Sequence, residues 1–371
     1  MINVCYIISD IYKSFAFEWI VKNCDYSKYR LHFILMNESD SEMEAFLKRE
    51  DIECYRLPYD SKLDLAFSVF KIRKFLKKNR INIVHCHLFE ACLAGLVAAK
   101  IAGVRKRIHT RHNSTINHDY YPHAVKYDKL INYLSTDIVA ISKVVKDVLI
   151  QKEKVPESKI KIIYHGFDFE DMYEIATTKG RAIKEKYKLT DAKHPVIGVI
   201  SRFIHYKGIQ HIIPAFKMLL KKYPNAHLVL GNAAGPFAKD INGMLNVLPI
   251  ESYTLIPFEE NIFGLYPVFD VFIHAPIHAE SEAFGLVYVE AWALGIPGIY
   301  TSSGIVKEVG AANENCIITD FKNEDMLYKS MCRILEEPIL RQKLIKNGKE
   351  LALAKFTIKE MWEHFNELYS K

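Results

Sequence analysis

The sequence predicts an α/β protein with two doubly wound, Rossmann-like parallel sheets that share a cleft. Short apolar runs alternate with segments of helical periodicity in both halves of the chain. The length of 371 residues favours two domains. A polar stretch rich in Lys and Glu over 169–194 suits a connector. We therefore expect a first domain over 1–168 and a second over 195–355.

Composition and charge place the chain among ordinary globular proteins, with 50% hydrophobic and 25% charged residues. No apolar run reaches the roughly 18 to 20 residues that cross a bilayer, and the start lacks a secretory pattern, so we expect a cytoplasmic location. Seven cysteines without metal-ligand spacing fit reduced thiols. The net charge of +6 is uneven, because residues 1–165 hold 27 Lys+Arg against 19 Asp+Glu, or +8, and the remainder holds 23 against 25, or −2.

In the first half, runs rich in Val, Ile and Tyr predict buried parallel strands. We expect these strands over 2–9, 29–36, 52–57, 81–87, 107–110, 137–141 and 161–164. Helices are expected between them over 14–23, 41–49, 61–80, 91–101 and 143–151, the last with Ser142 as its N-cap.

The expected helix over 61–80 has two interpretations. It carries Phe67 and Phe70 among six cations between Lys71 and Arg80. Its cations could lie on an anionic membrane face. Alternatively, it is a surface helix that covers the parallel sheet.

Two further segments of the first half are candidates for ligand binding. The strand over 81–87 ends in His85-Cys86-His87, where we favour cleft-lining residues over a metal site because no other ligand cluster is visible. The segment 113–128 has little apolar periodicity, so we expect a loop above a strand end and assign it to the acceptor.

In the second half, strands are expected over 196–200, 227–231, 253–257 and 271–273, with a further strand reaching residue 300. Helices are expected over 208–223, 265–269, 325–337, 339–353 and 358–370.

The segment 273–300 is the centre of the functional prediction. Leu286 and Val289 begin a helical periodicity that Gly295 ends, so Gly285 lies near a helix start. Unpaired N–H groups and the helix dipole make that position suitable for binding phosphate. Glu282 lies just before this position and Glu290 more than one turn inside the helix, so both could flank a diphosphate and accept hydrogen bonds from sugar and ribose hydroxyls.

This segment resembles the signature of glycosyltransferase family 4, the retaining enzymes of GT-B fold. The resemblance rests on Glu282 and Glu290 at their spacing, on Phe284-Gly285-Leu286 between them and on Gly295-Ile296-Pro297 after them. It implies an N-terminal acceptor domain, a C-terminal donor domain for a nucleotide sugar, and a last helix over 356–371 that crosses back to the first domain.

The resemblance also implies roles for residues elsewhere in the donor domain. Arg202 and Lys207, cations at the mouth of a parallel sheet, would hold the donor pyrophosphate and neutralise the leaving group. Phe258 stands where the family binds the nucleotide base, and Phe284, Gly285 and Leu286 would complete the donor site with Glu290.

In the first domain, the resemblance places a histidine close to the transferred sugar. His112 is the matching position and His109 is its rival. The expected catalytic set is therefore Glu282, His112, Arg202 and Lys207. One departure is that residues 10–14 contain no glycine, where many family members have a glycine-rich turn near the diphosphate.

The implied activity is transfer of a sugar from a nucleotide sugar to a glycan or lipid-linked acceptor, with retention of configuration and without metal or other cofactor. Bacterial cell-surface polysaccharide synthesis, on the inner face of the plasma membrane, is the expected setting. An epimerase or phosphorylase of the same architecture and a non-catalytic scaffold are the alternatives. Nucleic-acid binding is not expected, since the basic clusters at 71–80 and 105–111 lack a recognition motif. The oligomeric state stays open.

Overall fold

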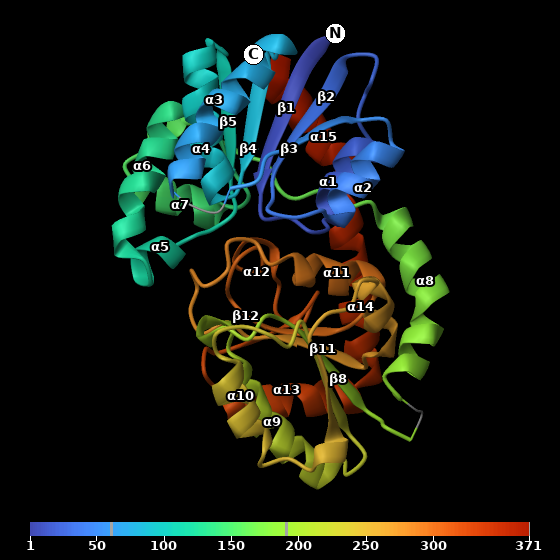
Figure 1. The fold of residues 1–371 in the computed structure, drawn as a ribbon. Helices are drawn as coiled ribbons and strands as arrows, with labels where there is room; N and C mark the ends of the chain where they lie inside the picture. The colour runs from blue at the N-terminus through green and yellow to red at the C-terminus, as the bar shows by residue number, and fades with distance from the viewer. Residues whose placement is uncertain (60–61, 190–191, 371) are drawn as a thin grey trace. The chain divides into compact units, whose positions relative to one another are not determined.

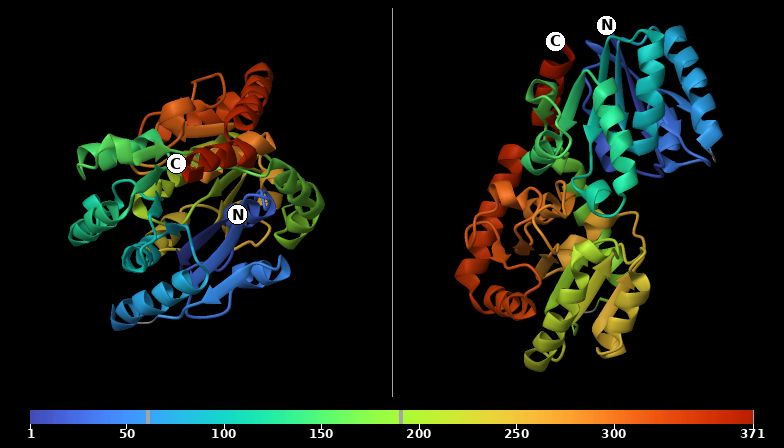
Figure 2. Two further views of the ribbon diagram at one scale, coloured as in Figure 1. Left: turned by 90° about the horizontal axis from the view of Figure 1, so that it is seen from above. Right: turned by 90° about the vertical axis from the view of Figure 1, so that its left-hand side faces the viewer.

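The computed structural model describes residues 1–59, 62–189 and 192–370. The chain divides into two compact units. Unit 1 comprises Met1–Phe167 and Ile358–Lys371, and unit 2 comprises Asp168–Thr357. Both ends of the chain therefore belong to unit 1 (Figures 1 and 2).

Unit 1 is built on a seven-stranded parallel sheet with the order β3-β2-β1-β4-β5-β6-β7. The chain leaves β1 towards one edge and, from β4 onwards, builds the other, so the winding reverses between β1 and β4. The strands are β1 (Ile2–Ser9), β2 (Tyr29–Met36), β3 (Glu53–Arg56), β4 (Ile83–His87), β5 (Lys106–Arg111), β6 (Asp137–Ala140) and β7 (Ile160–Ile162).

Helices cover both faces of this sheet (Figure 1). They are α1 (Phe15–Lys22), α2 (Glu42–Arg49), α3 (Lys62–Lys78), α4 (Phe89–Ala102), α5 (Ile116–Asp119), η1 (Pro122–Ala124), α6 (Val125–Leu134), α7 (Lys143–Gln151), η2 (Glu157–Lys159) and α15 (Ile358–Ser370). Cys5 and Ile7 of β1 pack in the core that α3 and α4 cover. Tyr6 points the other way, as alternation in a strand requires, and its hydroxyl lies 2.8 Å from that of Tyr369 in α15.

The segment 113–128 differs from the predicted loop, because it forms α5, η1 and the start of α6. Buried polar contacts hold it in place. Arg111 pairs with Asp128 at 2.6 Å and with Glu153 at 2.7 Å, and all three side chains are almost inaccessible to solvent. Apolar periodicity could not indicate this arrangement, since its contacts are ionic. For the helix predicted over 61–80, the first residue, Ser61, lies outside the described residues.

Unit 2 is built on a six-stranded parallel sheet with the order β10-β9-β8-β11-β12-β13. The strands are β8 (Val196–Ile200), β9 (His227–Gly231), β10 (Tyr253–Ile256), β11 (Val271–His274), β12 (Gly298–Thr301) and β13 (Ile317–Thr319). The helices are α8 (Phe169–Lys186), η3 (His205–Lys207), α9 (Ile209–Lys222), α10 (Ala238–Leu245), η4 (Ile250–Ser252), η5 (Ile262–Val268), α11 (Leu286–Leu294), α12 (Val306–Val309), α13 (Glu324–Glu336) and α14 (Pro338–Lys355).

The predicted fold class of two doubly wound parallel sheets is confirmed. The stretch 169–194, expected as a connector, contains the 18-residue helix α8, which packs against η5 within unit 2. Within the described part of the chain, no helix has both the length and the apolar composition that a membrane span requires.

Candidate active site

The strand order of unit 2 reverses between β8 and β11, which are neighbours in the sheet. In doubly wound sheets, ligands bind outside the carboxyl ends of the strands at such a reversal. Arg202 and Lys207 follow β8, and Glu282 and Gly285 follow β11. The topology therefore brings two cations, a carboxylate and a helix start to one end of the same sheet.

Gly208 allows the loop after β8 to approach the loop after β11. It has a left-handed conformation with φ of 79°, and a Cβ atom here would overlap the carbonyl oxygen of Ala275. This close approach places the preceding residue, Lys207, against the acidic loop that follows β11.

Glu282 is held by two side chains at this end of the sheet. Its Oε1 atom accepts a hydrogen bond from Lys207 Nζ and lies 2.7 Å from Nε2 of His274, the last residue of β11. Burial would raise the pKa of Glu282, but the charge of Lys207 and the bond from His274 outweigh burial and lower this pKa to about 2. Glu282 is thus a fixed, ionised hydrogen-bond acceptor.

The turn after β12 holds the loop around Glu282. Ser303 accepts a hydrogen bond from the backbone N–H of Glu282 at 3.1 Å and donates one to the carbonyl of Ala279 at 3.2 Å. Thr301 donates to the carbonyl of Pro276 at 2.8 Å. Ser303 is fully buried, so its hydroxyl positions the loop.

The helix α11 begins at the position where the sequence predicted phosphate binding. Its N-cap, Gly285, has φ of 83°, and a Cβ atom there would collide with the ring of Tyr288. Leu286 is exposed in the first turn. The side chain of Phe284 is buried and meets Phe356 edge to face, so this residue could reach a ligand only through its backbone.

Glu290 lies on the buried side of α11. Its Oε2 atom accepts a hydrogen bond from the hydroxyl of Tyr266 in η5, at 2.5 Å. Burial raises the pKa of Glu290 to about 7, although the bond from Tyr266 acts in the opposite direction. Near neutral pH this side chain exists in both protonation states.

Arg202 and Phe258, like Leu286, are exposed members of the predicted donor site. Arg202 follows β8 and forms no ion pair with any described residue. Phe258 follows β10 with 62% of its surface exposed. A free cation and an open aromatic face are suited to a diphosphate and a base, respectively.

His112 belongs to a group of imidazoles at the carboxyl end of the unit 1 sheet. Its Nε2 atom lies 2.9 Å from Nδ1 of His87, and its ring stacks on that of His165 at 5.5 Å between centroids. Burial lowers the pKa of His112 to about 4. The rival His109 is buried, with Nδ1 2.8 Å from the hydroxyl of Ser135. The contact of His112 with a sugar and the cleft shared by both sheets stay predictions.

Two family models match the chain in succession. The model described as Glycosyltransferase Family 4 matches residues 23–171, and the model described as Glycosyl transferases group 1 matches residues 181–351. The chain belongs to glycosyltransferase family 4.

Curated relatives of this family 4 chain align over most of their length. The capsular polysaccharide biosynthesis glycosyltransferase CapM of Staphylococcus aureus is 27% identical over 310 residues, which cover 82% of this chain and 80% of CapM. A UDP-Gal:alpha-D-GlcNAc-diphosphoundecaprenol alpha-1,3-galactosyltransferase of Escherichia coli is 22% identical over 322 residues, covering 81% and 78% of the two chains. Anabaena Alr3699/HepE, solved with UDP-glucose, superposes with a TM-score of 0.84 at 17% identity over 100% of both chains. This likeness supports the GT-B fold.

Three contacts of the predicted site residues of this family 4 glycosyltransferase, two in unit 2 and one in unit 1, escaped the sequence prediction. His274 and Tyr266 hold the two glutamates, and His87 holds His112. His274 and His87 each end a buried strand, and a polar residue at a carboxyl strand end is a signal that sequence can give. Tyr266 gave no such signal, because its partner lies 24 residues away on another helix.

Proposed function

We propose that this protein transfers a hexose from a nucleoside diphosphate sugar to a hydroxyl group of a glycan or lipid-linked acceptor, with retention of configuration. The observation that carries this proposal is the Lys207–Glu282 pair beside the start of α11, where the strand order of unit 2 reverses. A cation, a fixed carboxylate and a helix N-terminus together suit a ligand that combines phosphate with sugar hydroxyls.

Each residue of the site has a distinct role in this proposal. Arg202 and Lys207 bind the diphosphate with the N–H groups at the start of α11, while Phe258 and the backbone around it contact the base. Glu290 accepts hydrogen bonds from the ribose. Glu282 accepts them from the transferred sugar, which His112 contacts as well.

The chemical step needs no protein nucleophile in this proposal. The bond from the anomeric carbon to the diphosphate oxygen breaks and gives an oxocarbenium-like transition state, and the cations stabilise the charge that develops on the leaving group. The acceptor oxygen attacks the same face of the sugar, and its proton passes to a phosphate oxygen of the departing nucleoside diphosphate. We expect no metal requirement, which activity in excess chelator would test.

The relatives support a setting for the proposed reaction. CapM is described as acting in capsular polysaccharide biosynthesis, and the E. coli galactosyltransferase is described by a UDP-galactose donor and a diphosphoundecaprenol-linked acceptor. Alr3699/HepE was solved with UDP and glucose. We accordingly propose synthesis of a bacterial cell-surface glycan at the inner face of the plasma membrane, with a uridine nucleotide as the first donor to test.

A nucleotide-sugar epimerase is the second candidate, because the UDP-GlcNAc 2-epimerase of Neisseria meningitidis shares the fold with a TM-score of 0.66 at 16% identity. Incubation of UDP-glucose, UDP-galactose and UDP-GlcNAc without acceptor separates the two activities. An epimerase would convert the donor, whereas a transferase leaves it nearly unchanged. A non-catalytic scaffold would do neither, with or without acceptor.

The decisive binding experiment uses calorimetry with UDP and with the three UDP-sugars. The double variant Arg202→Ala, Lys207→Ala should lose UDP affinity by about a hundredfold, because two charge-assisted contacts of about 1.5 kcal/mol each disappear. Lys221→Ala, an exposed lysine at the far end of α9, serves as the matched control. Equal UDP affinity in the double variant and the control would contradict the proposed donor site.

A further inference from the structure

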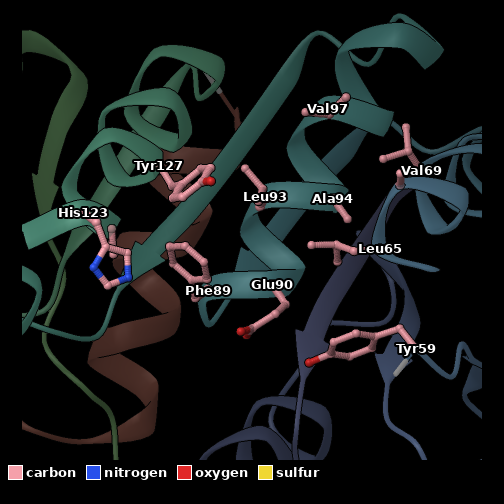
Figure 3. Close-up of a pocket in the computed structure, with 12 residues that line it drawn as sticks. Tyr59, Leu65, Val69, Phe89, Glu90, Leu93, Ala94, Val97, His123 and Tyr127 are labelled. Atoms are coloured by element: carbon pink, nitrogen blue, oxygen red, sulfur yellow. The ribbon is translucent and has the colours of Figure 1, made fainter. Parts of the chain in front are cut away.

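Unit 1 contains an apolar groove that the proposed donor site does not use. The groove encloses about 650 Å³ between α3, α4 and the segment from η1 to α6 (Figure 3). Its walls include Leu65 and Val69 of α3, Phe89, Leu93 and Val97 of α4, and Tyr127 of α6. Such a long apolar lining fits a hydrocarbon chain better than a free sugar.

One end of the groove is polar. Glu90 and Tyr59 lie toward this end, and Val69 and Val97 toward the other (Figure 3). The hydroxyl of Ser9, the last residue of β1, lies 3.4 Å from the carboxylate of Glu90. Tyr59 donates a hydrogen bond to Asp10 at 2.7 Å. Glu90 follows β4, so the polar end lies where the strand order of unit 1 reverses from β1 to β4.

The outer face of α3 beside the groove is both aromatic and basic. Phe67 and Phe70 are 63% and 68% exposed, although neighbouring residues of the same helix line the groove. The exposed face also carries four lysines, Lys71, Lys74, Lys77 and Lys78. Exposed aromatic rings with a row of cations on one helix face complement an anionic bilayer surface.

The segment 113–128 forms the opposite wall of the groove through His123, Ala124 and Tyr127. The sequence assigned this segment to the acceptor, and one of the two interpretations of the helix over 61–80 was a membrane face. In the structure both line the same groove. A ligand with a membrane-derived chain and an acceptor hydroxyl accounts for this arrangement in a single molecule.

We propose that the groove binds the hydrocarbon chain of a membrane glycolipid acceptor, with its sugar head group at the Glu90 and Tyr59 end. This assignment rests on the proposed transferase function and names its acceptor class. The head group at that end is a sugar, because a carboxylate accepts hydrogen bonds from hydroxyls and repels a phosphate placed directly beside it. The bilayer is the source of the ligand, because α3 presents its aromatic and basic face next to the groove.

The first test is calorimetry with methyl, hexyl and octyl glucoside, each below the concentration at which it forms micelles. Octyl glucoside should bind about fifteenfold more tightly than hexyl glucoside, since each buried methylene contributes about fourfold in affinity. Leu93→Glu should abolish this dependence on chain length. Ile339→Glu, an apolar-to-acidic change at an 85% exposed position of α14, should preserve it.

Two further variants guard against simpler explanations. Leu93→Trp fills the groove while it keeps the lining apolar, so it should also abolish the chain-length dependence without a charge, and thermal melting checks that it folds. The wild-type protein should bind octyl glucoside more tightly than octyl phosphate, and Glu90→Gln should remove this preference. Equal affinity of the wild-type protein for methyl and octyl glucoside would overturn the proposal. A dependence on chain length that both Leu93 variants retain would overturn it as well.

The second test is flotation with phosphatidylglycerol vesicles and with phosphatidylcholine vesicles. The protein should float with the anionic vesicles, and the double variant Phe67→Ser, Phe70→Ser should lose most of this association. Wild-type protein that stays unbound would overturn the membrane as the source of the ligand. A dimer in sedimentation velocity that Leu93→Glu dissociates would overturn the proposal in favour of a second copy in the groove.

A UDP titration on the same samples separates this proposal from the donor assignment. The groove variants should keep wild-type UDP affinity. If UDP binds and the three glucosides bind with equal affinity, only the proposal about the groove is contradicted. If affinity for the glucosides rises with chain length and UDP does not bind, the proposed transferase function is contradicted instead.

Discussion

Lys207 and Glu282 form an ion pair that joins the loop after β8 to the loop after β11. Both loops leave the carboxyl end of the unit 2 sheet at the reversal of its strand order. The pair keeps an ammonium group and a carboxylate in place before any ligand arrives, so a bound diphosphate and sugar would meet groups that are already oriented.

Replacement of Glu282 by Gln should lower kcat on the order of hundredfold, because the amide keeps the size of the side chain and removes the charge that meets the sugar hydroxyls. UDP affinity should stay close to wild type. Initial rates of sugar transfer and UDP calorimetry measure the two effects. Glu251→Gln, at an exposed position of η4, is the control, and wild-type transfer by the Glu282 variant would refute the sugar contact.

His274→Phe should lower kcat by about tenfold or more, since a hydrogen bond to a charged group contributes about 1.5–3 kcal/mol. The phenyl ring retains the contact with Tyr288 but cannot donate to Glu282. His274 acts here as a positioning residue. His274→Gln, whose amide can still donate, should recover part of the rate. Equal rates in the Phe and Gln variants would argue against positioning and for packing alone.

Donor affinity should fall as pH is lowered through about 7, because the pKa of Glu290 is raised to about 7 and its protonated form is a poorer acceptor for ribose hydroxyls. Tyr266→Phe removes a hydrogen bond that favours the ionised carboxylate, so the midpoint should move to higher pH. Titrations with UDP-glucose between pH 5.5 and pH 8.5 measure both curves, because its diphosphate, unlike that of UDP, has no ionisation in this range. Glu290→Gln should show no such midpoint, and a variant that retains it would assign the titration to another group.

The free energy of unfolding should fall as pH decreases from about 6.5 towards 4. Burial lowers the pKa of His85 to about 3 and that of His112 to about 4, so the unfolded chain binds more protons in this window. Each such group contributes at most about 1.4 kcal/mol per pH unit. The depressed pKa of Glu282 acts separately, because its contribution is present above about 4.5 and is lost only below that pH.

Urea unfolding at several pH values measures this slope. His85→Gln should reduce it, and His123→Gln, at an exposed position, should leave it unchanged. A wild-type stability that is flat between pH 6.5 and pH 4.5 would contradict the buried, neutral state of these imidazoles.

The sequence predicted the strands and the limits of α11 because these features follow from local rules. The bounds of β1 and β2 coincide with the apolar runs, which buried parallel strands require on both faces. Gly285 and Gly295 bound α11 with left-handed conformations, so the helix limits were visible in two residues.

The remaining features depend on contacts between distant residues. The helices in 113–128 form around Arg111, Asp128 and Glu153, and no periodicity records a buried ionic cluster. The groove likewise forms only where α3, α4 and α6 come together. The sequence of each segment alone is typical of an ordinary surface element. The partners of Glu282 and Glu290 became visible only when the strands were placed in order.

The hydroxyl of Tyr369 meets both Tyr6 and His85, so the hydrophobic interior of unit 1 includes the last turn of α15. All of unit 2 is encoded between these partners. During translation, the ribosome therefore releases the residues that complete unit 1 only after it has made unit 2. Until then the nascent N-terminal half has Tyr6 and His85 without the hydroxyl of Tyr369 that contacts both in the finished unit.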